Sequence, residues 1–231
     1  MKAMQSKTFF VTGTDTGVGK TLVSCALLQA FQKQGYTTAA LKPIASGGIE
    51  TAKGLCNEDV LMLSENATLK LPYEIINPYL FSEPIAPYIA AQHSQRTMTL
   101  KELHKACEAG LHCGADRILM EGVGGWLQPI NAKETVADFI AELKLPVVMV
   151  VGMRLGCINH TLLTFQNIKS YGVPFLGWVA NCIDPEMLVL KENIETLTEY
   201  LQMPPLAILP YQSEVNIKTL SDYFLNFVDE L

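Results

Sequence analysis

Apolar and polar positions change their spacing in a regular way along the 231 residues, and this pattern predicts alternating strands and helices. Short apolar runs predict strands, whereas apolar residues at helical spacing predict helices. The alternation predicts an α/β fold with a mainly parallel sheet and helices on both faces. The predicted strands span 8–12, 37–41, 117–122, 146–151, 175–181 and 206–209, and the predicted helices span 20–34, 100–113, 135–143, 159–171, 186–201 and 221–228.

Two segments do not follow this alternation. Four prolines interrupt residues 55–88, and we expect short helices separated by loops there. The stretch KPIASGG at 42–48 follows a predicted strand, and its Pro43, Gly47 and Gly48 disfavour regular structure. We therefore expect an open loop whose backbone is exposed to a ligand. Because no repeat or linker interrupts the chain, we expect a single domain over 1–231.

Composition and charge limit the classes of protein that the chain can belong to. With 49% hydrophobic and 17% charged residues, the chain fits a sheet that is buried on both faces. Its longest apolar run, 145–153, is far shorter than the roughly 20 residues that span a bilayer, and no signal peptide is evident, so we expect a cytoplasmic protein without a membrane partner. A net charge of −6 argues against a nucleic-acid partner.

Six cysteines are scattered along the chain without a CxxC pair or a matching histidine spacing. This spacing predicts neither a zinc site nor a disulfide framework. We expect most of these cysteines to be small buried apolar residues.

The segment GTDTGVGKT at 13–21 lies between the first predicted strand and the first predicted helix. In a phosphate-binding loop, backbone N–H groups and a helix N-terminus converge on phosphate oxygens, while one lysine neutralises charge and one hydroxyl reaches magnesium. Lys20 and Thr21 stand at those positions. The usual spacing is GxxxxGK[ST], but Thr14 occupies its first position and Gly13 lies one residue too early. The strand-loop-helix context nevertheless predicts a P-loop NTPase-like fold that binds a nucleotide.

Further chemistry follows other predicted strands. Lys42 and Ser46 follow the second strand, and Glu121 ends the strand RILMEG. Ligands of parallel sheets lie beyond the carboxyl ends of the strands, so we expect these side chains near the phosphate loop. A carboxylate at that place can meet magnesium opposite Thr21. Taken alone, each of these residues also fits a role without chemistry: Lys42 and Glu121 as solvated residues at strand ends, and Ser46 as a turn residue.

Six motifs in order, GTDTGVGKT, LKPIASG, EGVGGW, VVGMRLGCINH, GWVAN and LPY, resemble those of the dethiobiotin synthetase family. The resemblance runs from residue 9 to about residue 214. It implies that 7,8-diaminononanoate, CO2 and ATP with Mg2+ react to give dethiobiotin, ADP and phosphate. The implied route passes through a carbamate and a carbamic-phosphoric anhydride.

The same resemblance assigns roles to residues. It implies catalytic roles for Lys20, Lys42 and Ser46 and magnesium ligands at Thr21, Asp59 and Glu121. Asp59 also fits a simpler role, because a carboxylate near a helix start interacts favourably with the helix dipole. The residues implied to bind the nucleotide are Thr14, Asp15, Thr16, Gly17, Val18, Gly19, Lys20, Thr21, Asp59, Glu121, Gly122 and Gly124, with Asn181, Pro210, Tyr211 and Glu214 near the base. Cys182 departs from the acidic residue of several relatives.

The resemblance also implies where the other substrate binds. Lys42, Ser46 and Gly125 would contact the diamine, while its carboxylate would meet a helix N-terminus in a neighbouring subunit. This arrangement implies a homodimer with shared active sites. The segment that would serve the partner comprises Leu155, Gly156, Cys157, Ile158 and Asn159. A nucleophilic role for Cys157 has only His160 nearby to support it, so we favour a packing role.

Three alternatives remain open at this point. A regulatory or partitioning ATPase of the deviant phosphate-loop class would carry KGGxGK[ST], and Asp15 fills the position of its extra lysine. A cobalamin-type amide synthase would need a fused glutaminase domain, for which the chain has no room. A non-catalytic nucleotide-binding module would not call for Lys42, Ser46 and Glu121 on three separate loops.

Overall fold

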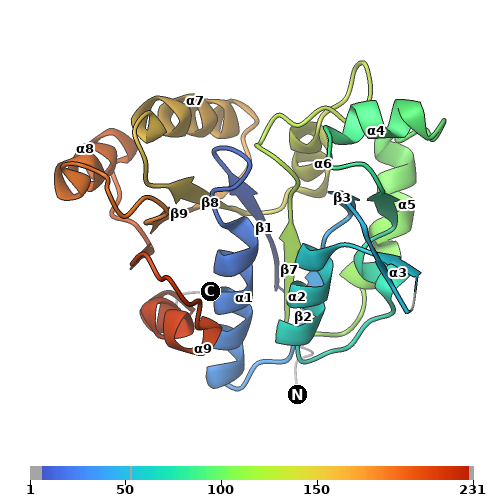
Figure 1. Cartoon of the computed structure of the whole chain (residues 1–231), viewed down its shortest axis with the longest axis horizontal. Helices are drawn as coiled ribbons and strands as arrows, with labels where there is room; N and C mark the ends of the chain where they lie inside the picture. Colours follow the sequence, from blue (N-terminus) through green and yellow to red (C-terminus); the bar gives the residue numbers. More distant parts are fainter. Residues whose placement is uncertain (1–6, 53, 229–231) are drawn as a thin grey trace.

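The computed structural model describes residues 7–52 and 54–228 and shows a parallel sheet between two layers of helices (Figure 1). Every pairing in the six-stranded sheet is parallel, so the predicted fold class is confirmed. In Figure 1 the strands labelled β1 and β7 point to the top, whereas the twist of the sheet turns β8 and β9 sideways. Across the sheet, the strands are β10 (Ala207–Leu209), β9 (Phe175–Asn181), β8 (Val147–Gly152), β1 (Lys7–Gly13), β7 (Arg117–Glu121) and β2 (Thr38–Leu41).

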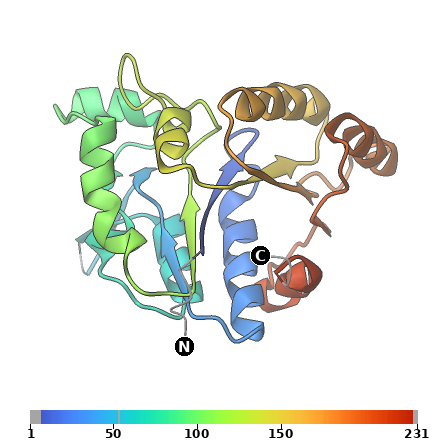
Figure 2. The same cartoon turned by 180° about the vertical axis from the view of Figure 1, so that it is seen from behind.

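The central strands are buried on both faces, as the apolar runs predicted. In β1, Phe10 packs into one core, and Phe9 and Val11 pack into the other. Figure 2 shows the face of the first core from behind. That face is covered by α4 (Pro87–His93), α5 (Leu100–Leu111), α6 (Val136–Leu143), α7 (Cys157–Ser170) and α8 (Leu190–Leu201). The opposite face is covered by α1 (Lys20–Lys33), α2 (Glu58–Asn66), α9 (Ile217–Leu220), the 3-10 turn η1 (Ser221–Phe224) and α10 (Leu225–Val228).

Helices α5 and α6 begin differently from α1. Helices α5 and α6 start with capping boxes, in which Thr99 pairs with Glu102 and Thr135 pairs with Asp138. Helix α1 starts after Gly19, which has φ 85°, and no side chain caps it. The first N–H groups of α1 are therefore available to an anion.

The expectation that residues 42–48 form an open loop was wrong in part. The strand β3 (Ile44–Ser46) lies inside that stretch and pairs in parallel with β6 (Tyr79–Phe81). Pro43 and Gly47 only flank the strand, so the residues between them are free to extend. The partner lies more than 30 residues away along the chain. Local sequence therefore gives no sign of the pairing.

Residues 55–88 also contain more than short helices. The strand β5 (Gly54–Cys56) reaches into this stretch and pairs in antiparallel fashion with β4 (Ile49–Thr51), which lies just before it, and β6 follows α3 (Tyr73–Ile76). The helix predicted from residue 186 begins only at Leu190, because Val189 has φ 50°, outside the helical region. The predicted closing helix 221–228 is a 3-10 turn followed by a short helix.

The structure also bears on the expectations for the cysteines and for membrane-spanning helices. Five of the six cysteines are buried, and Cys113 is partly exposed. Within residues 7–52 and 54–228, no helix is both long and apolar enough to cross a membrane.

Candidate active site

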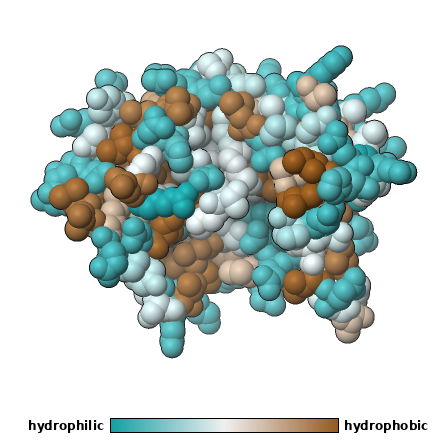
Figure 3. Space-filling view, turned by 45° about the horizontal axis from the view of Figure 1, so that its top comes forward, coloured by the Kyte–Doolittle hydropathy of each residue, from teal (hydrophilic) through white to brown (hydrophobic). Residues whose placement is uncertain are grey.

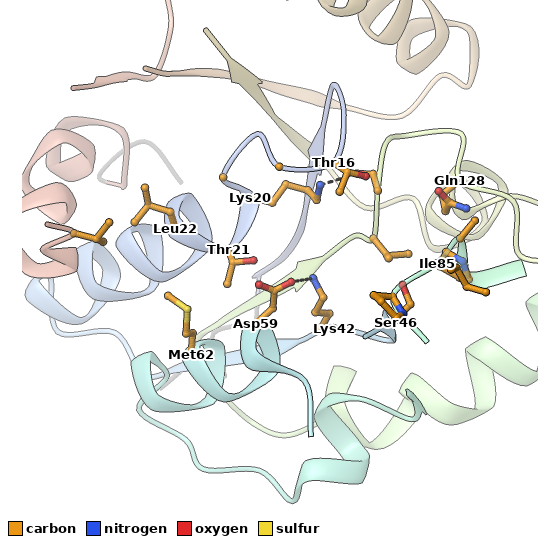
Figure 4. Close-up of a pocket in the computed structure, with 18 residues that line it drawn as sticks. Thr16, Lys20, Thr21, Leu22, Lys42, Ser46, Asp59, Met62, Ile85 and Gln128 are labelled. Carbon is orange, nitrogen blue, oxygen red and sulfur yellow. Dashed lines mark hydrogen bonds and ion pairs between the residues drawn. The ribbon is translucent and has the colours of Figure 1, made fainter. Parts of the chain in front are cut away.

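A cavity of about 750 Å3 lies at the carboxyl-terminal edge of the sheet (Figure 4). Parts of the chain that are far apart in sequence meet around it, as expected for ligand sites of parallel sheets. The lining residues are Thr16, Gly17, Gly19, Lys20, Thr21 and Leu22 of the loop and α1, Lys42 and Ser46 near β3, Asp59 and Met62 of α2, residues 84–87, Val123, Gly124, Gln128 and Val215.

Lys20 lies over the phosphate loop and is almost fully buried. Its Nζ donates hydrogen bonds to the carbonyl oxygens of Gly124 at 2.7 Å and Asp15 at 3.1 Å. Burial and, after it, the nearby Lys42 charge lower the pKa of Lys20 to about 8, against the raising effect of the neighbouring carboxylates. A phosphate group would stabilise the charged form at this position.

Four polar side chains from α1, β2, α2 and β7 meet beside Lys20. Lys42 Nζ lies 2.5 Å from Glu121 Oε1 and 3.0 Å from Asp59 Oδ2. Thr21 Oγ1 donates to the same Glu121 oxygen at 2.9 Å. Burial opposes the charged forms of Lys42 and Asp59. The Glu121 carboxylate, and after it Asp59, nevertheless raise the pKa of Lys42, and the Lys42 charge lowers the pKa of Asp59. Both groups are therefore charged at neutral pH.

The cluster also contains an unsatisfied acceptor. Glu121 Oε2 is buried and has no hydrogen-bond partner in the described part of the chain. An orphaned carboxylate oxygen is costly unless a ligand meets it. Together with the Thr21 hydroxyl and the Asp59 carboxylate, it offers oxygen donors of the kind that Mg2+ prefers. The residues present thus fit a magnesium ion.

The opposite end of the cavity is neutral. Ser46 lies there at the end of β3, and Figure 4 shows it on the same side of the cavity as Ile85 and Gln128. Asn57 Nδ2 donates to the carbonyl oxygen of Gly47 at 2.8 Å, while Asn57 Oδ1 accepts the Val60 N–H and caps α2. One side chain therefore joins the loop of Ser46 to the helix that carries Asp59.

The residues expected near the base lie in two places. Asn181 is buried and donates from Nδ2 to the carbonyl oxygen of Val18 at 2.9 Å. A Cβ atom on Gly19 would lie 2.2 Å from that nitrogen, so the amide packs directly against the phosphate loop. Pro210, Tyr211 and Glu214 are exposed, and their neighbour Val215 lines the cavity.

The segment 155–159 lies outside the cavity. Leu155 is 97% exposed, and α7 starts after Gly156, at φ 93°, without a side-chain cap. The Cys157 N–H already donates to the Arg154 carbonyl oxygen at 3.0 Å. Burial raises the pKa of the Cys157 thiol, which disfavours the thiolate.

The structure adds residues that the sequence patterns did not identify. Arg154 Nη2 lies 2.6 Å from Asp15 Oδ2, so a cation reaches the phosphate loop from the end of β8. Because Arg154 lies just after a buried strand, its position in the sequence could have predicted that it lies near the site. Gln128 and residues 84–87 line the cavity, but nothing in their local sequence marks them. Gly122 and Gly125 lie beside the site: a Cβ atom on Gly122 would meet Phe10, and Gly125 borders a second, smaller groove with Thr14.

A parallel sheet, a glycine-containing loop before an uncapped helix, and a lysine over that loop define a phosphate-loop NTPase fold. A family model described as an AAA domain matches residues 7–219. The chain is 47% identical over 207 residues to the ATP-dependent dethiobiotin synthetase of Cellvibrio japonicus, covering 90% of each chain. It is 45% identical to the ATP-dependent dethiobiotin synthetase 1 of Escherichia coli K12, covering 90% of this chain and 92% of the relative. The chain belongs to the family of ATP-dependent dethiobiotin synthetases and is an enzyme, as its motifs indicated.

Solved structures share the fold at low sequence identity. The cell division protein MinD of Aquifex aeolicus superposes with a TM-score of 0.59 at 14% identity, covering 98% of both chains. The MinD protein of Pyrococcus horikoshii, solved with Mg-ADP, gives a TM-score of 0.56 at 16% identity, covering 96% of both chains. These similarities concern the fold alone.

Proposed function

We propose that the enzyme closes a cyclic urea on 7,8-diaminononanoate with CO2 and ATP, giving dethiobiotin, ADP and phosphate in biotin biosynthesis. The observation that carries this proposal is that Lys20, Lys42, Asp59 and Glu121 come together at one cavity, beside the neutral lining residues Ser46, Ile85 and Gln128 (Figure 4). The names of relatives at 44–47% identity support it. We propose that the whole chain, 1–231, works as one domain in the cytoplasm.

The proposed chemistry brings two anions together. One substrate amine takes up CO2 as a carbamate, and the carbamate oxygen attacks the γ-phosphate of ATP. The second amine then displaces phosphate from the resulting carbamic-phosphoric anhydride. Lys20 and Lys42 offset the repulsion between carbamate and triphosphate, which is strong in a site that excludes water. Ser46 holds the substrate near its reacting nitrogens.

The remaining proposed roles concern nucleotide and metal. Residues 14–21, Gly122 and Gly124 would hold the phosphates, and Asn181 with the loop 210–214 would meet the base. Mg2+ would be held by Thr21, Asp59 and Glu121 and would neutralise charge on the β- and γ-phosphates. The buried, unpaired Glu121 Oε2 supports this assignment.

A homodimer is part of the proposal. Leu155, Leu163 and Leu188 are 97%, 60% and 84% exposed. Figure 3, with the carboxyl-terminal edge of the sheet turned forward, shows several separate apolar groups among polar ones on this face. A second copy would cover such residues. Its uncapped α7 N-terminus, with Ile158 and Asn159, would meet the substrate carboxylate. Gly125 would contact the substrate from within the same chain.

The direct test supplies ATP, Mg2+, bicarbonate and 7,8-diaminononanoate and measures dethiobiotin by mass. We expect product in amounts equal to the ADP formed, and we expect a dimer by light scattering. ADP release that is independent of the diamine, without dethiobiotin, would contradict the proposal and favour a regulatory ATPase. Lys20→Gln serves as the inactive control, because it removes the cation of the phosphate loop.

A further inference from the structure

Gln128 is a polar side chain of the cavity for which the proposed chemistry gives no role. Its backbone is fixed on both sides: the N–H donates to the Gly125 oxygen at 3.3 Å, and the carbonyl oxygen accepts the Val136 N–H at 2.9 Å. Val136 is the first residue of α6. The side-chain amide makes no hydrogen bond within residues 7–52 and 54–228, yet it lines the cavity. A fixed backbone with a free amide is suited to contact a ligand.

The amide of Gln128 lies against Gly124, which is a partner of Lys20. A Cβ atom on Gly124 would lie 2.6 Å from Gln128 Oε1, so the amide oxygen covers Gly124. The carbonyl oxygen of Gly124 in turn accepts the hydrogen bond from Lys20 Nζ at 2.7 Å. Gln128 therefore borders the point where the phosphate loop ends and the neutral part of the cavity begins.

Charge is distributed unevenly along this cavity. Its charged lining residues are Lys20, Lys42 and Asp59, and all three belong to the cluster beside the phosphate loop. At one end, next to Lys42, the polar side chains of Gln128 and Ser46 stand beside the apolar residues Pro84, Ile85, Ala86, Pro87 and Val123 (Figure 4). A substrate nitrogen placed at that end meets neutral donors and acceptors.

This distribution suits an amine nucleophile, which must lose its proton before it can attack CO2 or an anhydride. Apolar surroundings lower the pKa of an amine, whereas a nearby carboxylate would raise it and keep the ammonium form. A carboxamide can accept an N–H and donate to a carbamate oxygen without stabilising the charged amine.

We propose that Gln128 binds the reacting nitrogens of the diamine from the side opposite the phosphate loop, together with Ser46, and keeps them uncharged. Gln128 then determines specificity for an amine substrate, and this role rests on the proposed function. Two substitutions separate its parts: Gln128→Met removes the hydrogen bonds at similar size, and Gln128→Glu adds a charge.

For Gln128→Met we expect the KM for the diamine to rise about tenfold, because one hydrogen bond of this kind is lost. The KM for ATP and the melting temperature should stay unchanged, since the amide makes no hydrogen bond to the residues that the structure describes. For Gln128→Glu we expect the acidic limb of the kcat/KM profile for the diamine to move upward by about one pH unit. The matched control is Gln34→Met at the exposed carboxyl end of α1, which should change none of these values.

Two results would overturn the role of Gln128 while the proposed function stands. The first is an unchanged diamine KM in Gln128→Met together with an unshifted pH profile in Gln128→Glu. The second is an equal rise of both KM values with a lowered melting temperature, which would indicate a structural role. Failure of the unaltered protein to form dethiobiotin would overturn the proposed function and the role of Gln128 with it.

Discussion

Lys42 and Glu121 form a buried ion pair, with Nζ 2.5 Å from Oε1 and side chains that are 4% and 0% exposed. The pair stands at the carboxyl ends of two neighbouring strands, β2 and β7. A charge left alone at such a place is costly, because water cannot reach it. The lysine that we propose for catalysis therefore also stabilises the fold.

Replacing Lys42 by glutamine should reduce both activity and stability. We expect turnover to fall at least about 100-fold and the free energy of unfolding to fall by about 3 kcal/mol, since Glu121 is left unpaired. Binding of a non-hydrolysable ATP analogue should survive. Steady-state kinetics, urea unfolding and calorimetry measure the three quantities. Lys191→Gln is the matched control, because that lysine is 86% exposed. A nearly unchanged turnover rate would remove Lys42 from the mechanism.

Lys20 should make nucleotide binding depend on pH. With a pKa of about 8 in the free protein, Lys20 loses its charge as the pH rises through 8. The affinity for an ATP analogue, measured without metal, should therefore fall above pH 8. In Lys42→Met the fall should move to higher pH, because a repelling charge is gone. A constant affinity up to about pH 9.5 would contradict the lowered pKa.

The same titration acts on stability in the opposite direction. The unfolded chain holds this proton up to its ordinary pKa of 10.5, whereas the folded chain releases it near 8. Between those values the unfolded state binds more protons, so the contribution of Lys20 to stability improves as the pH rises. The variant Lys20→Met has no titratable group at this position. Comparing its free energy of unfolding with that of the unaltered protein, by urea unfolding at pH 7.5 and 9.5, isolates the contribution of Lys20.

The Asp15–Arg154 ion pair should have a modest and salt-dependent effect. Its side chains are 42% and 43% exposed, so solvent screens their attraction. We expect Arg154→Met to raise the KM for ATP roughly threefold at low ionic strength and to have little effect at about 0.5 M salt. A double-mutant cycle with Asp15→Asn tests whether the two side chains act together. Strictly additive effects of the two substitutions would mean that they act independently.

Asn181→Ala separates two roles of one amide. Loss of the hydrogen bond to Val18 should loosen the phosphate loop and weaken ATP and GTP binding alike, by roughly fivefold. Loss of base recognition should also reduce the preference for ATP over GTP. Competition binding with both nucleotides measures the two effects separately. An unchanged ratio with weaker binding overall would assign base recognition to other residues.

The parts of the site that sequence predicted are those with local causes. Gly19, at φ 85°, precedes α1, which has no side-chain cap. The short sequence of a glycine followed by lysine and threonine is enough to predict this uncapped helix start. Lys42 and Glu121 meet because β2 and β7 end at the same edge of the sheet, and Asp59 reaches them from the first turn of α2. Strand direction made the meeting of Lys42 and Glu121 predictable, whereas Asp59 was expected only from the family resemblance, and the distances depended on packing.

The parts that sequence missed depend on distant partners. The segment Ile44–Ser46 forms a strand only because residues 79–81 pair with it. Gln128 reaches the cavity because α6 holds its carbonyl oxygen. Arg154 meets Asp15 across 139 positions of the chain. No local propensity records such contacts.

Because β3 pairs with β6, two separate sheets contribute residues to the cavity. The six-stranded sheet carries the phosphate loop, and the small sheet carries Ser46 and leads into residues 84–87. An engineer could therefore exchange β3, β6 and residues 84–87 for those of a relative with another substrate, provided that Asp59 of α2 is kept and the phosphate loop is left unchanged. The graft would have to include both strands together with Asn57, which ties the small sheet to α2.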